Sequence, residues 1–178
     1  RMDNVGENLL LEKAIGNDPV VNATVEYTPR DSPQYNGKPE RKFAWLWQGV
    51  RSNLNGAMLP SGIRQPLWCY AALYTELVAN LIVTPRKKGN GSSYTQFHKK
   101  EWPQLRHVHP FGLLGVVKTA KPIQNKLKDK GTVMLYLGPA TSHGKDVCRM
   151  FNLTTKKVIL TRDVKWMDKF YGDWKGLS

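Results

Sequence analysis

The sequence contains little cysteine, few acidic residues and no long apolar run, and each shortage excludes a class of protein. Among its 178 residues, Cys69 and Cys148 are the only cysteines, and they lie far apart without a Cys-x-x-Cys pair. The sequence therefore supports neither a disulfide scaffold nor a zinc finger. Because it has no apolar run of about 20 residues and no Arg-rich presequence, membrane binding is the weaker interpretation.

Basic residues outnumber acidic ones by 27 to 14, which gives a formal net charge of +13. The excess is uneven, because residues 1–40 carry 4 Lys or Arg and 7 Asp or Glu, whereas residues 41–178 carry 23 and 7. Lys and Arg side chains that neutralise phosphates gain from counterion release, so nucleic acid is the first candidate partner. With 40% hydrophobic residues, the chain has enough apolar side chains for one ordinary core or two small ones.

Residue patterns predict an α+β chain with its helices mainly in the first half. They indicate a short helix over residues 9–15, a strand over residues 20–27, a helix that starts at Pro39, and an apolar helix over residues 66–83 that is buried against it. In the helix from Pro39, apolar side chains recur at helical spacing and include Trp47, which we expect in the core. For Trp45 the sequence leaves two roles open, packing in the core and stacking on a nucleic-acid base.

In the second half of the sequence, residue patterns predict short strands that follow a turn-rich, basic stretch. The expected strands cover residues 113–117, 132–137, 147–151, 158–161 and 164–167, and glycines and an Asn152–Lys157 turn separate them. His107 and His109 lack a Cys or an acidic pair at ligand spacing. We therefore expect them to flank a β-turn or contact phosphate rather than to bind zinc.

Two carboxylates lie in motifs that metal-dependent phosphoryl transfer uses. Asp3 begins the segment Asp-Asn-Val-Gly-Glu, and Glu40 lies in Asn-Gly-Lys-Pro-Glu-Arg-Lys, downstream of Tyr-Thr-Pro at residues 27–29. Hard carboxylate oxygens are the ligands that paired Mg²⁺ ions require. Taken singly, each residue has a simpler interpretation, Asp3 as a turn residue and Glu40 as a carboxylate favoured by the helix dipole.

Together with Gly112, Lys-Leu-Lys-Asp-Lys-Gly at residues 126–131 and Thr-Arg-Asp-Val-Lys-Trp at residues 161–166, these motifs resemble the integrase of copia-type retrotransposons. That integrase is part of a Gag-Pol polyprotein, and the resemblance covers nearly the whole chain. It implies the C-terminal part of an RNase H-like catalytic core over residues 1–84, a basic linker over 85–104, a small SH3-like β-barrel over 105–170 and a tail over 171–178.

The resemblance also implies a chemistry. Asp3 and Glu40 would be catalytic residues and ligands of Mg²⁺ or Mn²⁺ in an enzyme that processes the element's DNA ends and joins them to target DNA. The complete enzyme is expected to form a homo-oligomer and to act in the nucleus after a cytoplasmic particle stage. The family's first catalytic aspartate and its zinc module would lie upstream of Arg1, so we expect this chain to be inactive alone.

Two other hypotheses stay open. Val5 stands where the family has a glycine, and a β-branched residue does not readily adopt a positive φ, which favours a catalytically dead, DNA-binding remnant or domesticated element. A protein-docking module is the other hypothesis, because small SH3-like folds serve many functions.

The expected DNA contacts are basic residues around Glu40, in the linker and on two turns of the barrel. They are Lys38, Arg41, Lys42, Arg86, Lys87, Lys88, Lys118, Lys121, Lys126, Lys128, Lys130, Lys156 and Lys157. As a group they form a credible patch for the phosphate backbone, whereas solvated surface charge is an equal alternative for any one lysine. Contacts to phosphate would make binding tolerant of sequence and sensitive to salt.

Overall fold

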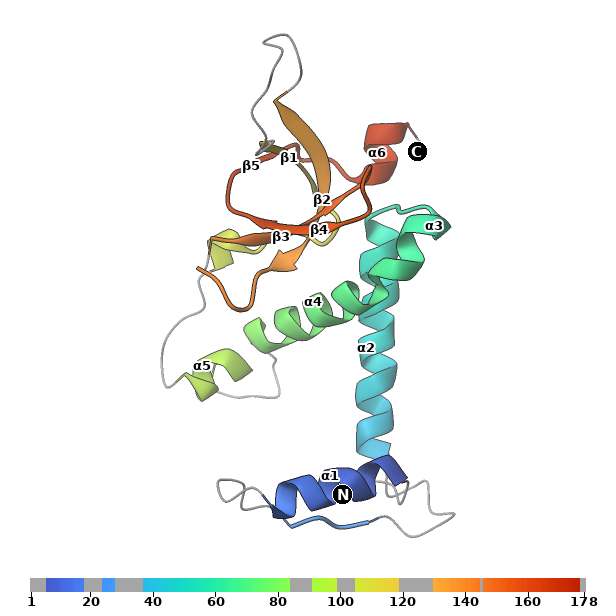
Figure 1. Ribbon diagram of the computed structural model, residues 1–178, viewed down its shortest axis with the longest axis vertical. Helices are drawn as coiled ribbons and strands as arrows, with labels where there is room; N and C mark the ends of the chain where they lie inside the picture. The colour runs from blue at the N-terminus through green and yellow to red at the C-terminus, as the bar shows by residue number, and fades with distance from the viewer. Residues whose placement is uncertain are drawn as a thin grey trace. The chain divides into compact units, whose positions relative to one another are not determined.

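The computed structural model describes residues 6–17, 24–27, 37–83, 91–98, 105–118, 130–144 and 146–176 (Figure 1). Its contacts divide the chain into two compact units, Arg1–Trp45 and Leu46–Ser178. The unit Arg1–Trp45 contains helix α1 (Gly6–Gly16), which confirms the helix predicted over residues 9–15, and the first part of α2 (Gly37–Gly56). Residues 20–23 of the strand predicted over residues 20–27 lie outside the described residues, and the described residues 24–27 contain only an isolated β-bridge at Tyr27.

The second unit begins with the remainder of α2, followed by α3 (Ser61–Arg64), a 3-10 turn η2 (Gln65–Leu67) and α4 (Trp68–Leu81). Helices α2 and α4 approach closely at Gly49, where an added Cβ would lie 2.3 Å from Cγ2 of Thr75. Beside this contact, Asn53 Nδ2 donates a hydrogen bond to Thr75 Oγ1 at 3.0 Å, and that hydroxyl donates to the Ala71 carbonyl at 2.7 Å. The buried hydroxyl is therefore fully satisfied.

The five strands form an open antiparallel sheet in the order β4-β3-β2-β1-β5 (Figure 1). They are β1 (Leu114–Lys118), β2 (Gly131–Pro139), β3 (Cys148–Asn152), β4 (Val158–Thr161) and β5 (Val164–Trp166). All five predicted strands are confirmed, with ends shifted by a residue or two. The described residues also contain α5 (Ser93–Phe97), η3 (Leu105–His107) and α6 (Tyr171–Lys175), which the sequence did not predict.

Strand β2 is the centre of the sheet and pairs with both β1 and β3. The register with β3 shifts between Tyr136 and Gly138, and Gly138 has a φ of 126°. Such a bulge bends a strand and increases its twist. At the next turn, the Asn152 side-chain oxygen accepts hydrogen bonds from the backbone N–H groups of Thr154 and Thr155, both at 2.9 Å, which closes the β3–β4 hairpin.

Two hydrophobic clusters lie on the two faces of the sheet. Leu135 and Leu137 of β2 belong to the cluster that contains Val50, Leu54 and Leu67 of the helical segment. The other cluster, on the opposite face, includes Met134, Tyr136, Cys148 and Met150. Burial of one such side chain contributes roughly 1.5–3 kcal/mol. The helices from residue 46 onward and the sheet therefore share one core. Residues 85–90 and 99–104 of the expected linker lie outside the described part.

One expectation about the helices was wrong. Trp47, expected in the core, is 45% exposed and stacks on the exposed ring of Trp68, with ring centroids 5.4 Å apart. The apolar helix α4 packs against α2 as predicted, although Leu73 on it is 58% exposed. The reason is that only one face of α4 meets the sheet and α2, while the stripe on α2 is buried only at Val50 and Leu54. In the described part of the chain, no helix has the length and apolarity needed to cross a bilayer.

Candidate nucleic-acid interface

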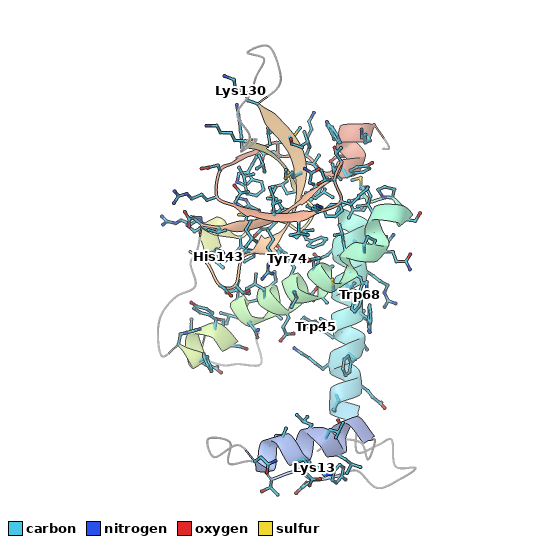
Figure 2. The ribbon with its side chains drawn as sticks, viewed as in Figure 1. Lys13, Trp45, Trp68, Tyr74, Lys130 and His143 are labelled. Atoms are coloured by element: carbon cyan, nitrogen blue, oxygen red, sulfur yellow. The ribbon has the colours of Figure 1, made fainter. Side chains whose placement is uncertain are left out.

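An open groove lined by cationic side chains lies where β1, β2 and β5 adjoin, with a volume of about 580 Å³. We call it the cationic groove. Figure 2 shows Lys130 at the start of β2, at one end of the sheet. The lining residues are Val116, Lys118, Lys130, Gly131, Arg162, Asp163, Val164 and Lys165.

The strand register brings these residues together from three parts of the sequence. Val116 pairs with Lys165 across β1 and β5, and Lys118 pairs with Gly131 across β1 and β2. Residues directly opposite in an antiparallel pair point to the same face, as do residues two apart on one strand. The side chains of Val116, Lys118 and Lys165 therefore share one face.

Arg162 and Asp163 reach the cationic groove through the tight turn between β4 and β5. The Asp163 N–H donates to Thr161 Oγ1 at 3.1 Å, and the Val164 N–H donates to the Arg162 carbonyl at 3.0 Å. This short connection fixes the backbone of the turn directly beside Lys165.

Four cations line the cationic groove, and Asp163 is the one carboxylate among its described lining residues. Lys118, Lys130, Arg162 and Lys165 are all exposed. Within the described residues, the side chains of these four form no hydrogen bond or ion pair with a protein group. Phosphate oxygens are the acceptors that their N–H donors bind best, bidentately in the case of arginine.

The cationic groove contains two of the predicted DNA contacts and two residues that sequence reasoning missed. Lys118 and Lys130 were predicted, but as members of a lysine-rich loop. Arg162 and Lys165 belong to the Thr-Arg-Asp-Val-Lys-Trp segment, which was noted only for its resemblance. Pairing of residues 114–118 with residues 164–166 was the missing signal, because it places Lys165 opposite Val116.

Other predicted contacts lie elsewhere or outside the described residues. Lys156 and Lys157 are exposed on the β3–β4 turn and do not line the cationic groove. For Lys38 the structure describes the backbone in α2 and not the side chain. The remaining predicted residues fall outside the described part of the chain: Asp3, Arg86, Lys87, Lys88, Lys121, Lys126 and Lys128.

Glu40 is exposed in the first turn of α2, where the helix dipole favours a carboxylate. Beside it, Arg41 Nε donates to the Gly37 carbonyl at 3.0 Å, and Lys42 Nζ lies 4.6 Å from the centroid of the Trp45 ring. The carboxylate oxygens of Glu40 have the hard donor chemistry that Mg²⁺ prefers. Across the described ranges, no group of three or more His, Cys, Asp or Glu residues gathers in a metal-binding arrangement. Glu40 fits as one ligand and does not form a site by itself.

His109 has a structural environment rather than a metal-binding one. Its ring packs on Trp166 with centroids 3.9 Å apart, and its carbonyl accepts a hydrogen bond from the Tyr74 hydroxyl at 2.8 Å. Burial lowers the pKa of His109; charge on His107 adds to this, and the Asp168 carboxylate opposes it. His109 directly precedes the turn in which the Leu113 N–H donates to the Pro110 carbonyl at 3.1 Å, as predicted.

Comparisons with known proteins identify no family for this chain. No protein-family model, no curated protein and no solved structure matches this chain. The resemblance to copia-type integrases therefore stays a prediction from sequence motifs, and the cationic groove is interpreted from its own chemistry.

Proposed function

We propose that this chain is a nucleic-acid-binding part of a copia-type integrase and that its cationic groove holds the sugar-phosphate backbone of DNA. The observation that carries the proposal is the convergence of Lys118, Lys130, Arg162 and Lys165 on one open surface, with a single carboxylate among the described lining residues. The charge of the whole chain, +13, acts in the same direction, because it attracts a polyanion over a distance and raises the rate of association.

The form of the sheet supports the SH3-like part of the proposal. Five short antiparallel strands with one long central strand suit a small barrel-like body, and the bulge between Tyr136 and Gly138 supplies the bend that such a body needs. In a barrel this small, side chains fill the interior. Any ligand therefore binds on its surface or loops. The cationic groove lies on that surface.

The chemistry of the cationic groove favours the phosphate backbone over base edges. Among its described lining residues, the polar ones are flexible cations and Asp163, and none is an Asn or Gln, the side chains that pair with adenine edges. Contacts to phosphate position a protein on DNA without reading sequence. Binding at the cationic groove is therefore tolerant of sequence.

The catalytic part of the proposal depends on the other unit. In the complete enzyme, Asp3 and Glu40 would hold Mg²⁺ or Mn²⁺, which would supply Lewis-acid stabilisation of the phosphodiester oxygens. Lys38, Arg41 and Lys42 would contact DNA nearby.

A catalytically dead remnant that binds DNA is the second candidate function, and one observation favours it. The cationic groove lies wholly within the unit Leu46–Ser178, so binding there uses neither Asp3 nor Glu40. The same surface serves an active integrase and an inactive remnant.

Chemical protection of lysines tests the proposed surface directly. The chain is treated with an amine-acetylating reagent, with and without duplex DNA, and each lysine is quantified by mass spectrometry. We expect DNA to protect Lys118, Lys130 and Lys165, which line the cationic groove. Lys169 and Lys175 are exposed elsewhere in the same unit and serve as internal controls that keep their reactivity. Equal protection of all five lysines, or protection of the controls alone, would refute the assignment.

A further inference from the structure

A second pocket lies between α4 and α5 and has a different chemistry from the cationic groove. It is lined by Asn80, Ser93, Tyr94, Phe97 and His98, with a volume of about 290 Å³. We call it the aromatic pocket. Three of these five described residues carry flat rings, and none of the five is Lys, Arg, Asp or Glu. These residues would therefore recognise a ligand through ring faces and hydrogen bonds rather than through formal charge.

The rings of the aromatic pocket form a contiguous cluster. The Tyr94 and His98 centroids are 4.2 Å apart with planes at 39°, and the Phe97 and His98 centroids are 5.1 Å apart with planes at 80°. Phe97 is 82% exposed, more than any other large apolar side chain among the described residues. A ring so exposed leaves surface available for contact with a planar ligand.

Local hydrogen bonds hold α5 in place for this role. The Ser92 hydroxyl accepts from the Thr95 N–H at 3.2 Å, and the Thr95 hydroxyl donates to the Ser92 carbonyl at 2.9 Å. Ser92 itself is buried, and Gly91 before it has a φ of 71°. The cap fixes the first turn of α5, so its aromatic side chains are largely ordered before a ligand arrives.

We propose that the aromatic pocket binds one unpaired nucleobase. The base stacks on Phe97, and its polar edge forms hydrogen bonds with the Asn80 amide. The inference rests on the proposed function, because a nucleic-acid strand that binds this unit through its phosphates also places its bases near the unit's surface. Every base has a π-face, and the Asn amide presents a donor and an acceptor together. Bases in an intact duplex have their faces covered, so the ligand is single-stranded or frayed nucleic acid.

The test compares the affinity of the chain for two oligonucleotides of equal length and charge at fixed salt, by fluorescence anisotropy. One is ordinary single-stranded DNA, and the other is an abasic sugar-phosphate strand. The wild-type chain should prefer the strand with bases by roughly 5- to 100-fold, the range that stacking of a base on an aromatic ring gives. Phe97→Ala should abolish this preference, and Phe97→Trp should restore it.

Leu73→Ala is the matched control, because Leu73 is an exposed apolar residue on α4 that does not line the aromatic pocket. It should keep the wild-type preference. A preference that survives Phe97→Ala, or that is equally lost in Leu73→Ala, would overturn the nucleobase inference while leaving binding at the cationic groove in place. If the wild-type chain bound neither strand nor duplex DNA, the proposed function would fail and the inference would fail with it.

Discussion

At the scale of single residues, the ring of His109 couples the charge state of the protein to its stability. The ring is partly buried between Trp166 and Tyr136, with centroid distances of 3.9 Å and 5.7 Å. Removing the imidazolium from water costs free energy, so burial lowers the pKa of His109 below its ordinary value of 6.5. The folded protein therefore prefers the neutral ring.

We predict that acid weakens the fold through His109. Because the folded pKa lies below the unfolded value, the unfolded chain binds the proton more tightly. The stabilisation is complete above the unfolded pKa of 6.5 and is lost as the pH falls through the folded pKa. Urea unfolding at several pH values between about 7.5 and 5 should show a decline in the free energy of unfolding. His109→Phe, which keeps a ring on Trp166, should show a flatter profile. Parallel profiles for the two proteins would count against this role.

Single residues also mark where sequence reasoning worked and where it failed. Lys118 and Lys130 were predicted contacts, because basic residues between strands are visible in the sequence. Arg162 and Lys165 were missed, because their place in the cationic groove depends on the pairing of β1 with β5. Helical spacing correctly placed Trp47 on the apolar stripe of its helix. It did not predict how much of that stripe is buried, because burial depends on how far the sheet extends along the helix.

At the scale of elements, the crossing of α2 and α4 depends on a glycine. Helix interiors disfavour glycine relative to alanine by about 1 kcal/mol, so its presence at residue 49 needs a reason. The reason is contact, because an added Cβ would lie 2.3 Å from Thr75 Cγ2 and 3.0 Å from Thr75 Oγ1. Gly49 allows the two helices to approach.

We predict that Gly49→Ala destabilises the protein by about 1–3 kcal/mol, as overpacking does, despite the better helix propensity of alanine. Thr75→Ser removes the clashing methyl group and keeps the hydroxyl that Asn53 contacts, so the double variant should recover part of the loss. Gly56→Ala, on the same helix with no atom within 4 Å of its added Cβ, is the control and should be neutral or stabilising. If Gly49→Ala and Gly56→Ala changed the free energy of unfolding in urea equally, the proposed role of Gly49 in the close approach of α2 and α4 would be contradicted.

Strands and long helices could be predicted from sequence, whereas single-turn helices could not. Short apolar segments separated by glycines and turn residues predicted all five strands. Helices α5 and α6 have too few residues for a periodic pattern, and local hydrogen bonds define them: the Ser92 cap in α5, and the Phe170 N–H donating to the Asp173 carboxylate at 3.2 Å in α6. The aromatic pocket was therefore missed together with α5.

At the scale of the whole molecule, charge and chemistry divide between two units. Residues 1–40 carry more acidic than basic side chains, and residues 41–178 carry most of the positive charge. The unit Leu46–Ser178 contains both the cationic groove and the aromatic pocket. We infer that nucleic-acid binding at these two sites belongs to this unit, whereas Glu40 lies in the unit Arg1–Trp45.

The most direct test of DNA binding at the cationic groove is the salt dependence of duplex affinity. Each phosphate neutralised contributes about 0.9 to the slope of log affinity against log salt, so Arg162→Ala with Lys165→Ala should reduce the slope by roughly 2. Lys169→Ala with Lys175→Ala removes the same charge from outside the cationic groove and should leave the slope unchanged. A wild-type affinity that does not fall with salt, or a slope that the Arg162 and Lys165 changes leave intact, would contradict the account.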